Sequence, residues 1–285
     1  MRYKKHIIDY NWFLVVEILG ISDDVSKLTE FIYNKFNGEN LYLTNIPLKL
    51  YKPINSITIK NFKSNEYSAL FNLSKSKETI NGLDLIFTFQ KNITKDIIQH
   101  EVQHAYQFSI NSREKSLKKL NDIRSARYSK MRVLTGTKRA DIIDNFIYLI
   151  YFLNNVEIEA FVNETYRKLK ESNCIKRNFK ELLSNSYAYQ ICKSIENYNI
   201  FNEFSYVDKE TKVKFFTYFK NEEHRLKKLK KDTFLKRIIR DLKFIFDKDL
   251  INNKELFDYM KKWDRYIESQ NNKLMKKLHR LYDLF

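Results

Sequence analysis

The sequence predicts an α+β fold in which helices dominate, with a small sheet in the N-terminal part. Short β-rich runs are confined to residues 54–89, whereas apolar residues recur at helical spacing through most of the remaining chain. Glycine and proline, which interrupt helices, number only 4 and 2 among 285 residues. We therefore expect a small N-terminal sheet beside a larger set of helices.

The N-terminal part contains helix signals followed by strand signals. Apolar spacing over residues 10–36 predicts a pair of helices, with a break and a new helix cap near Ser22. A turn signal at residues 37–40, followed by Pro47 and Pro53, then indicates a loop-rich passage. Strands are expected at residues 54–59, 67–73 and 83–89.

A helix is expected directly after the third strand, because Asn92 or Thr94 can cap its first turn. At about 100° per residue, one broad arc of this helix is apolar. The arc consists of Ile97, Ile98, Val102, Ala105 and Phe108. The opposite side carries Gln99, Gln103 and Gln107.

Two of the five histidines, His100 and His104, lie at the border between these sides, with Glu101 directly after the first. A spacing of four residues places both rings on the same helical face. This is the HExxH pattern, in which two histidines bind zinc and the glutamate acts as general base. The alternative is a chance pentapeptide on an ordinary amphipathic helix. A zinc site here still needs a third ligand.

A second long helix is predicted from about Ala140 to Leu169, and Glu157 lies near the centre of its apolar arc. An ionised carboxylate there is costly without a cation or hydrogen-bond partners, and zinc held by the two histidines would supply the cation. The alternative is a salt bridge with lysine or arginine. Glu159 projects toward another side, and Glu164 lies about 10 Å further along the helix, too far to join the same metal easily.

The formal net charge is +17, from 52 lysines and arginines against 35 acidic residues. Such an excess indicates attraction to nucleic acid, anionic membrane or acidic protein. The alternative is compositional, because chains from AT-rich genomes are rich in lysine, asparagine, isoleucine, tyrosine and phenylalanine. The basic stretch 112–139 is read as a solvated helical face, with a lid or an anionic-ligand surface as alternatives.

Membrane-spanning, secreted and disulfide-rich classes are not indicated. No apolar run approaches the length of a transmembrane helix, and Asp9 and Glu17 interrupt the run that follows the basic start. Cys174 and Cys192 are the only cysteines, and they form no CxxC pair. We therefore expect a cytoplasmic or virion-associated protein without a secretion signal.

Two regions are expected. Residues 1–172 hold the sheet and both site helices, and residues 173–285 form a basic helical region packed on or extending this core. Its helices are predicted at residues 179–198, 212–231, 232–246 and from 254 onward. Basic clusters beside aromatic residues are compatible with nucleic-acid contact, but the helical spacing favours packing for these aromatics. His224 and His279 are predicted to lie on the surface.

With HEVQHAYQ at residues 100–107 and YFLNNVEIEAF at residues 151–161, the chain resembles zincin-like metallopeptidases of the gluzincin type. It looks most like versions encoded by phages and mobile elements. The resemblance covers about residues 83–169 and implies a zincin-like core around the HExxH helix. It implies His100, His104 and Glu157 as ligands of one Zn²⁺ ion. Some gluzincins use an acidic residue four positions after the third ligand to orient a histidine; Phe161 stands there, so such support must come from elsewhere.

The activity implied by the resemblance is zinc-dependent hydrolysis of a peptide or protein substrate, which an edge of the sheet can bind as an added strand. Glu101 would activate the zinc-bound water and deliver its proton to the leaving amine. Tyr106, Tyr148 and Tyr151 are candidate oxyanion stabilisers, and the sequence does not choose among them. The rival hypotheses are a basic nucleic-acid-binding or virion structural protein with a structural or degenerate zincin site, and a catalytically silent scaffold.

Overall fold

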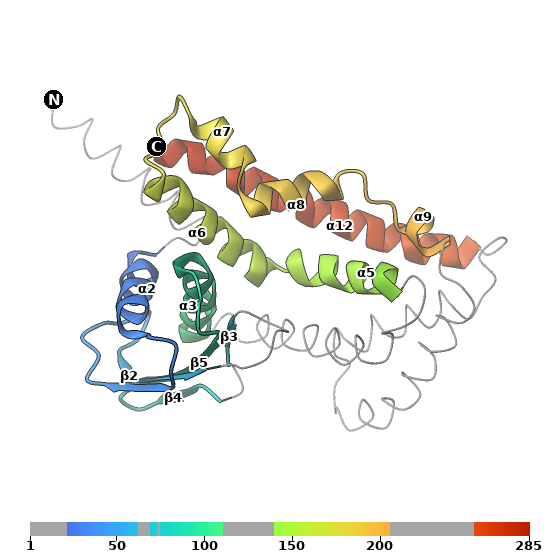
Figure 1. Ribbon diagram of the computed structural model, residues 1–285. Coiled ribbons are helices and arrows are strands. Elements are labelled where there is room, and N and C mark those ends of the chain that lie inside the picture. Colours follow the sequence, from blue (N-terminus) through green and yellow to red (C-terminus); the bar gives the residue numbers. More distant parts are fainter. Residues whose placement is uncertain (1–21, 62–68, 73–74, 111–139, 206–253) are drawn as a thin grey trace, which may run out of the picture. The chain divides into compact units, whose positions relative to one another are not determined.

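The computed structural model describes residues 22–61, 69–72, 75–110, 140–205 and 254–285. In this part the protein is α+β with helices outweighing strands, as the sequence predicts (Figure 1). The chain divides into two units. The first contains the sheet, the helices α2 (Asp23–Lys35), α3 (Lys95–Ser109), α6 (Asn155–Glu171) and α7 (Phe179–Ser184), and residues 274–285. The second contains α5 (Ala140–Phe152), α9 (Ile200–Ser205) and α12 (Lys254–Arg280) as far as Lys273.

The sheet combines parallel and antiparallel pairing. Its strands are β1 (Leu41–Thr44), β2 (Ile54–Asn61), β3 (Ala69–Phe71), β4 (Lys77–Thr79) and β5 (Gly82–Phe89). β5 pairs in parallel with β2 and antiparallel with β3 and β4, and β1 pairs antiparallel with β2. Ile57 lies opposite Leu85 and Ile59 opposite Phe87, so the buried residues of β2 and β5 share one face. The three predicted strands are confirmed, and β1 and β4 are additional.

Helices α2 and α3 pack against this buried face of the sheet (Figure 1). The predicted apolar arc of α3 is confirmed at its centre, where Ile98, Val102 and Ala105 are completely buried. α2 contributes Val25, Leu28 and Ile32 to the same core. α2 is the second helix of the predicted N-terminal pair; residues 10–21, where the first was expected, lie outside the described residues.

The glutamine side of α3 is also buried, against α6. Gln99, Gln103 and Gln107 are each at most 2% exposed. Gln99 donates a hydrogen bond to Oδ1 of Asn163, and Nδ2 of Asn163 donates to Oε1 of Gln103 at 2.8 Å. The polar side of α3 is therefore a second internal interface, held together by paired amides because each buried amide needs a partner.

The single helix predicted from residue 140 to 169 is wrong, because the structure ends α5 at Phe152 and starts α6 at Asn155. The backbone N–H of Asn154 donates to the carbonyl oxygen of Tyr151 at 3.1 Å. This bond spans three residues, whereas an α-helical bond spans four, so the turn is tighter here. Asparagine side chains compete for backbone hydrogen bonds, so two in succession favour such a break. The interruption places Glu157 in the first turn of α6.

The helix predicted at residues 179–198 also consists of two pieces, α7 and α8 (Tyr187–Ile195). In the first unit, the ring of Phe179 contacts those of Tyr282 and Phe285, at 5.4 and 6.2 Å between centroids. Cys174 and Cys192 are free and buried. No disulfide framework was predicted for them.

In the second unit, the rings of Phe146 on α5 and Trp263 on α12 meet edge to face, with 5.7 Å between centroids. The helix predicted from residue 254 is confirmed, and His279 is exposed as predicted. The structures predicted for residues 112–139 and 212–246, together with His224, lie outside the described residues.

Among the helices that are described, none combines the length and apolar character needed to cross a membrane. The region boundary near residue 172 stays a prediction.

Candidate metal centre

The two histidines project from the same side of α3. This helix begins after Thr94, one of the two predicted caps, whose backbone is extended (φ −85°, ψ 155°). His100 and His104 lie one turn apart, with 4.9 Å between ring centroids and an angle of 86° between the rings. The His104 side chain is 5% exposed and that of His100 is 13% exposed. Both rings are thus held in the interior, with His100 nearer to solvent.

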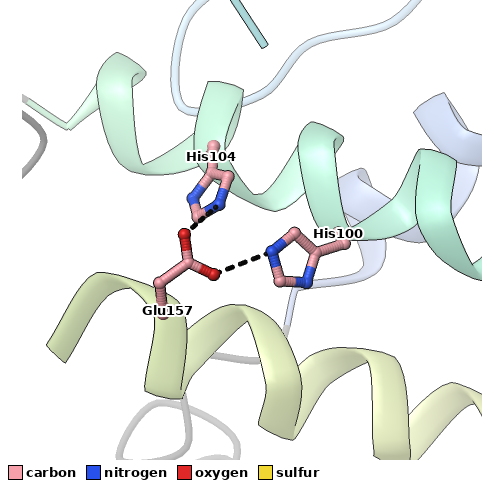
Figure 2. A group of neighbouring side chains, drawn as sticks. All are labelled: His100, His104 and Glu157. Carbon is pink, nitrogen blue, oxygen red and sulfur yellow. Dashed lines mark hydrogen bonds and ion pairs between the residues drawn. The ribbon is translucent and has the colours of Figure 1, made fainter. Parts of the chain in front are cut away.

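Glu157 reaches both histidines from the start of α6 (Figure 2). Nε2 of His100 is 2.9 Å from Oε2 of Glu157, and Nε2 of His104 is 3.3 Å from Oε1. The Glu157 side chain is completely buried. The structure therefore brings the three predicted ligands together, with one ligand atom of each within 4.8 Å of the others. In the described part of the chain, no second group of three such side chains meets this condition.

The outer nitrogens of both rings face acceptors, which favours a proton on each outer nitrogen. Gln107 donates from Nε2 to the carbonyl oxygen of Val156 at 3.0 Å, so its Oε1 is the atom that lies 2.9 Å from Nδ1 of His104. Nδ1 of His100 lies 3.5 Å from Oε2 of Glu164. Protons on both Nδ1 atoms leave lone pairs on both Nε2 atoms, and these point toward the Glu157 carboxylate.

Two imidazole lone pairs and a carboxylate that converge in a buried space repel one another unless a cation lies among them. Oε1 of Glu157 is buried and has no hydrogen bond. Ligand atoms around a tetrahedral zinc ion lie about 3.4 Å apart. Here the two histidine nitrogens lie 2.9 and 3.3 Å from different oxygens of the Glu157 carboxylate, and one ligand atom of each residue lies within 4.8 Å of the others. Two imidazole nitrogens and one carboxylate oxygen are also a donor set of catalytic zinc sites. The residues therefore fit a zinc ion.

Without a metal, a proton supplies the positive charge. Burial by itself lowers the pKa of His100, but the neighbouring carboxylates of Glu157, Glu164 and Glu101 together outweigh burial and raise the pKa well above its usual value. Burial by itself raises the pKa of Glu157, but the charges of His104 and His100 hold the pKa well below its usual value. The N-terminal turn of α6 also stabilises this carboxylate, because helix N-termini favour negative charge.

Glu101, the predicted general base, lies beside the ligand group and is not one of its three members. It is 6% exposed, and its carboxylate accepts a hydrogen bond from the backbone N–H of Phe71 in β3. Its negative charge contributes to the raised pKa of His100, which places it within electrostatic reach of the site. A general base must lie near the metal without binding it, and this role of Glu101 stays a prediction.

The three candidate oxyanion stabilisers are differently placed. Tyr106 lies on the far side of α3 from His104, where its hydroxyl bonds to Ser22 and burial raises its pKa. Tyr148 and Tyr151 belong to α5 in the second unit, where the rings of Tyr148 and Phe152 are 5.9 Å apart. Within the first unit the structure brings no member of the trio to the ligands, and the role of Tyr148 and Tyr151 stays a prediction.

Two residues that support the histidines, Gln107 and Glu164, were not among the predicted site residues. Gln107 follows His104 by three residues, a spacing at which helical side chains meet. Glu164 follows Glu157 by two turns on the same stripe and, as expected, does not join the ligand group. Its contact with His100 depends on how α3 lies along α6, which spacing within one helix does not reveal.

Comparisons of the chain with protein-family profiles, with curated proteins and with solved structures found no match. The fold and the site define a class: an α+β protein whose HExxH helix faces a buried glutamate on a second helix. Membership of the zincin-like family rests on the residues described above and forms part of the following proposal.

Proposed function

We propose that the protein is a zinc-dependent peptidase in which His100, His104 and Glu157 bind one zinc ion and Glu101 is the general base. The observation that carries this proposal is the convergence of three ligand atoms, one of them a buried carboxylate oxygen without a hydrogen bond. A hydrogen-bonded ion pair leaves that oxygen unsatisfied, whereas one divalent cation satisfies all three atoms.

The chemistry follows from the placement of Glu101. Bound zinc would lower the pKa of a water molecule to about 7 and polarise the scissile carbonyl group. Glu101 accepts the proton of the attacking water and delivers it to the leaving amine. The N–H of Phe71 holds the Glu101 carboxylate in a fixed position, so less reorganisation is needed during proton transfer.

A peptide substrate is supported by the strand next to Glu101. Among the described strands, β3 stands at one end of the strand order. Its Phe71 N–H is directed to Glu101, while the N–H of Asn72 donates to Ile86 of β5. Edge strands bind extended peptides by pairing with them as a further strand. A peptide along β3 would lie with its backbone beside the proposed base.

Native mass spectrometry before and after chelation, combined with digestion of a peptide library, tests the proposal. We expect one zinc ion per chain, loss of the ion and of peptide cleavage on chelation, and recovery of both when zinc is added. A protein that takes up no zinc on reconstitution contradicts the proposal. A protein that binds zinc and cleaves nothing in the library supports the silent scaffold instead.

The net charge of +17 favours a second candidate function, binding of nucleic acid. In that case the affinity for DNA or RNA should fall steeply with salt concentration and be unaffected by chelation. Filter binding at several salt concentrations, with and without chelator, separates this function from zinc-dependent hydrolysis.

A further inference from the structure

We propose that Glu164 is a positioning residue of the metal centre, which holds His100 in the orientation and tautomer that zinc binding requires. This inference rests on the proposed function. His100 lies between two carboxylates: its Nε2 is 2.9 Å from Glu157 and its Nδ1 is 3.5 Å from Oε2 of Glu164. A histidine that gives its outer N–H to a carboxylate has a fixed ring orientation and a more basic inner nitrogen.

Glu164 is itself held by charged neighbours. Its Oε1 lies 3.1 Å from Nζ of Lys168, and the same Nζ lies 2.7 Å from Oδ2 of Asp96 in the first turn of α3. Four side chains therefore form a row in which each ionised group contacts a group of the opposite charge or a proton donor. In order, they are Asp96, Lys168, Glu164 and His100. The row joins α3 to α6 at both ends and limits where the Glu164 carboxylate can lie.

Exposure is lower at the end of this row nearest Glu157 than at its outer end, where the side chain of Asp96 is 21% exposed. The side chain of Lys168 is 40% exposed, whereas those of Glu164 and His100 are both 13% exposed. Exposed ion pairs contribute little to stability, so the main effect of the pair of Lys168 with Asp96 is to position the Lys168 side chain. The contact of Glu164 with His100 lies where water screens charges less, and there a lost partner costs more.

Phe161 complements Glu164 on the same side of α6. Its ring contacts the His100 ring at 4.8 Å between centroids and an angle of 61°. The apolar ring of Phe161 restricts the tilt of His100 but cannot accept its proton. Glu164, three residues further along the helix, supplies the acceptor that Phe161 lacks.

The test is the zinc affinity of the full chain, measured by competition with a chromophoric chelator. Glu164→Gln removes the charge and keeps an acceptor oxygen, so we expect zinc binding to weaken about 10-fold; Glu164→Ala should approach about 100-fold. The matched control is Glu171→Gln, on the same helix, because Glu171 pairs with Arg167 and Lys95. This control should bind zinc as the wild type does.

Two further measurements separate positioning from general loss of structure. The visible spectrum of the Co²⁺-substituted protein should change in Glu164→Ala and be unaltered in Glu171→Gln, because the spectrum reports ligand geometry. Lys168→Met should weaken zinc binding in the wild-type background and have no further effect in Glu164→Ala, because Lys168 acts through Glu164. Urea unfolding in the presence of chelator shows whether the variants are folded. If Glu164→Ala does not fold, the comparison is made with Glu164→Gln.

The outcomes distinguish this inference from the proposed function. If the wild type binds zinc and both Glu164 variants bind it as tightly as Glu171→Gln, Glu164 is not a positioning residue and the zinc site stands without it. If the wild type binds no zinc, both proposals are wrong. Weaker zinc binding by the Glu164 variants, together with the altered cobalt spectrum, supports the inference.

Discussion

Oε1 of Glu157 lies 3.3 Å from Nε2 of His104, completely buried, yet forms no hydrogen bond with it. The two atoms form an ion pair and are close enough to bind one cation. The relationship ties the first turn of α6 to the middle of α3. It makes Glu157 the residue whose change should affect metal binding most.

Glu157→Gln keeps the size of the side chain and removes its charge. We expect zinc affinity to fall by about 100-fold or more, because even the loss of an outer partner of a ligand costs about 10- to 100-fold. Competition titration measures the affinity, with Glu171→Gln as the control for a charge lost elsewhere on α6. Equal zinc binding by the two variants would contradict the role of Glu157 as third ligand.

The stability of the zinc-free protein should depend on pH through His100 and Glu157. The folded-state pKa of His100 is raised above 6.5, so its contribution is full below pH 6.5 and is lost as the pH rises through the folded-state pKa. The folded-state pKa of Glu157 lies below 4.5, so its contribution is full above pH 4.5 and is lost as the pH falls. His100 and Glu157 therefore stabilise the folded, zinc-free protein most between pH 4.5 and 6.5.

Urea unfolding in the presence of chelator, at a series of pH values, measures this effect. The difference in the free energy of unfolding between wild type and Glu157→Gln should be greatest within that window. A difference that is constant across the pH series would show that the pair is not charged in the folded protein. Zinc affinity should instead increase with pH, since His100 must lose its proton to bind the metal.

Glu101→Gln should retain zinc while the turnover number for peptide cleavage falls by about 10²- to 10⁴-fold, the usual contribution of a general base. Metal analysis and cleavage assays on the same preparation measure both quantities. If this variant cleaves as fast as the wild type, Glu101 is not the base. Loss of zinc from the variant would indicate a structural role instead.

Gln107→Leu removes the hydrogen-bond partner of Nδ1 of His104 and the bonds that Gln107 donates to Val156 and Glu159. An unpaired buried polar group costs about 1 to 3 kcal/mol, so the zinc-free protein should lose a similar amount of unfolding free energy. Urea denaturation measures this loss. The control Gln190→Leu changes an exposed glutamine of α8 and should have little effect.

The convergence of His100, His104 and Glu157 was predictable because each residue carries a signal within its own helix. HExxH fixes the two histidines on one face, and Glu157 is a charge within an apolar arc. The pairing of Gln99 and Gln103 with Asn163 was not predictable in this way. A hydropathy period assigns amides to the polar side of a helix, and it does not say whether water or another amide faces them.

The break before Glu157 illustrates a second limit. Leu153, Val156 and Ala160 continue the helical spacing across the break, so the apolar pattern alone predicts one helix. The signal lay in the adjacent Asn154 and Asn155, whose local hydrogen bonding opposes the pattern. Strand β4 gave no apolar signal either, because all three of its residues are exposed and it depends on pairing with β5.

The unit that holds the candidate metal centre draws its residues from distant parts of the chain. A ribosome delivers His100 and His104 first, Glu157 later, and the buried Leu274 and Leu278 of the same unit later still. A nascent chain that extends only through α3 therefore presents an incomplete two-histidine site. Secure capture of the metal should follow translation of α6, which limits the time during which an unfinished chain holds a reactive ion.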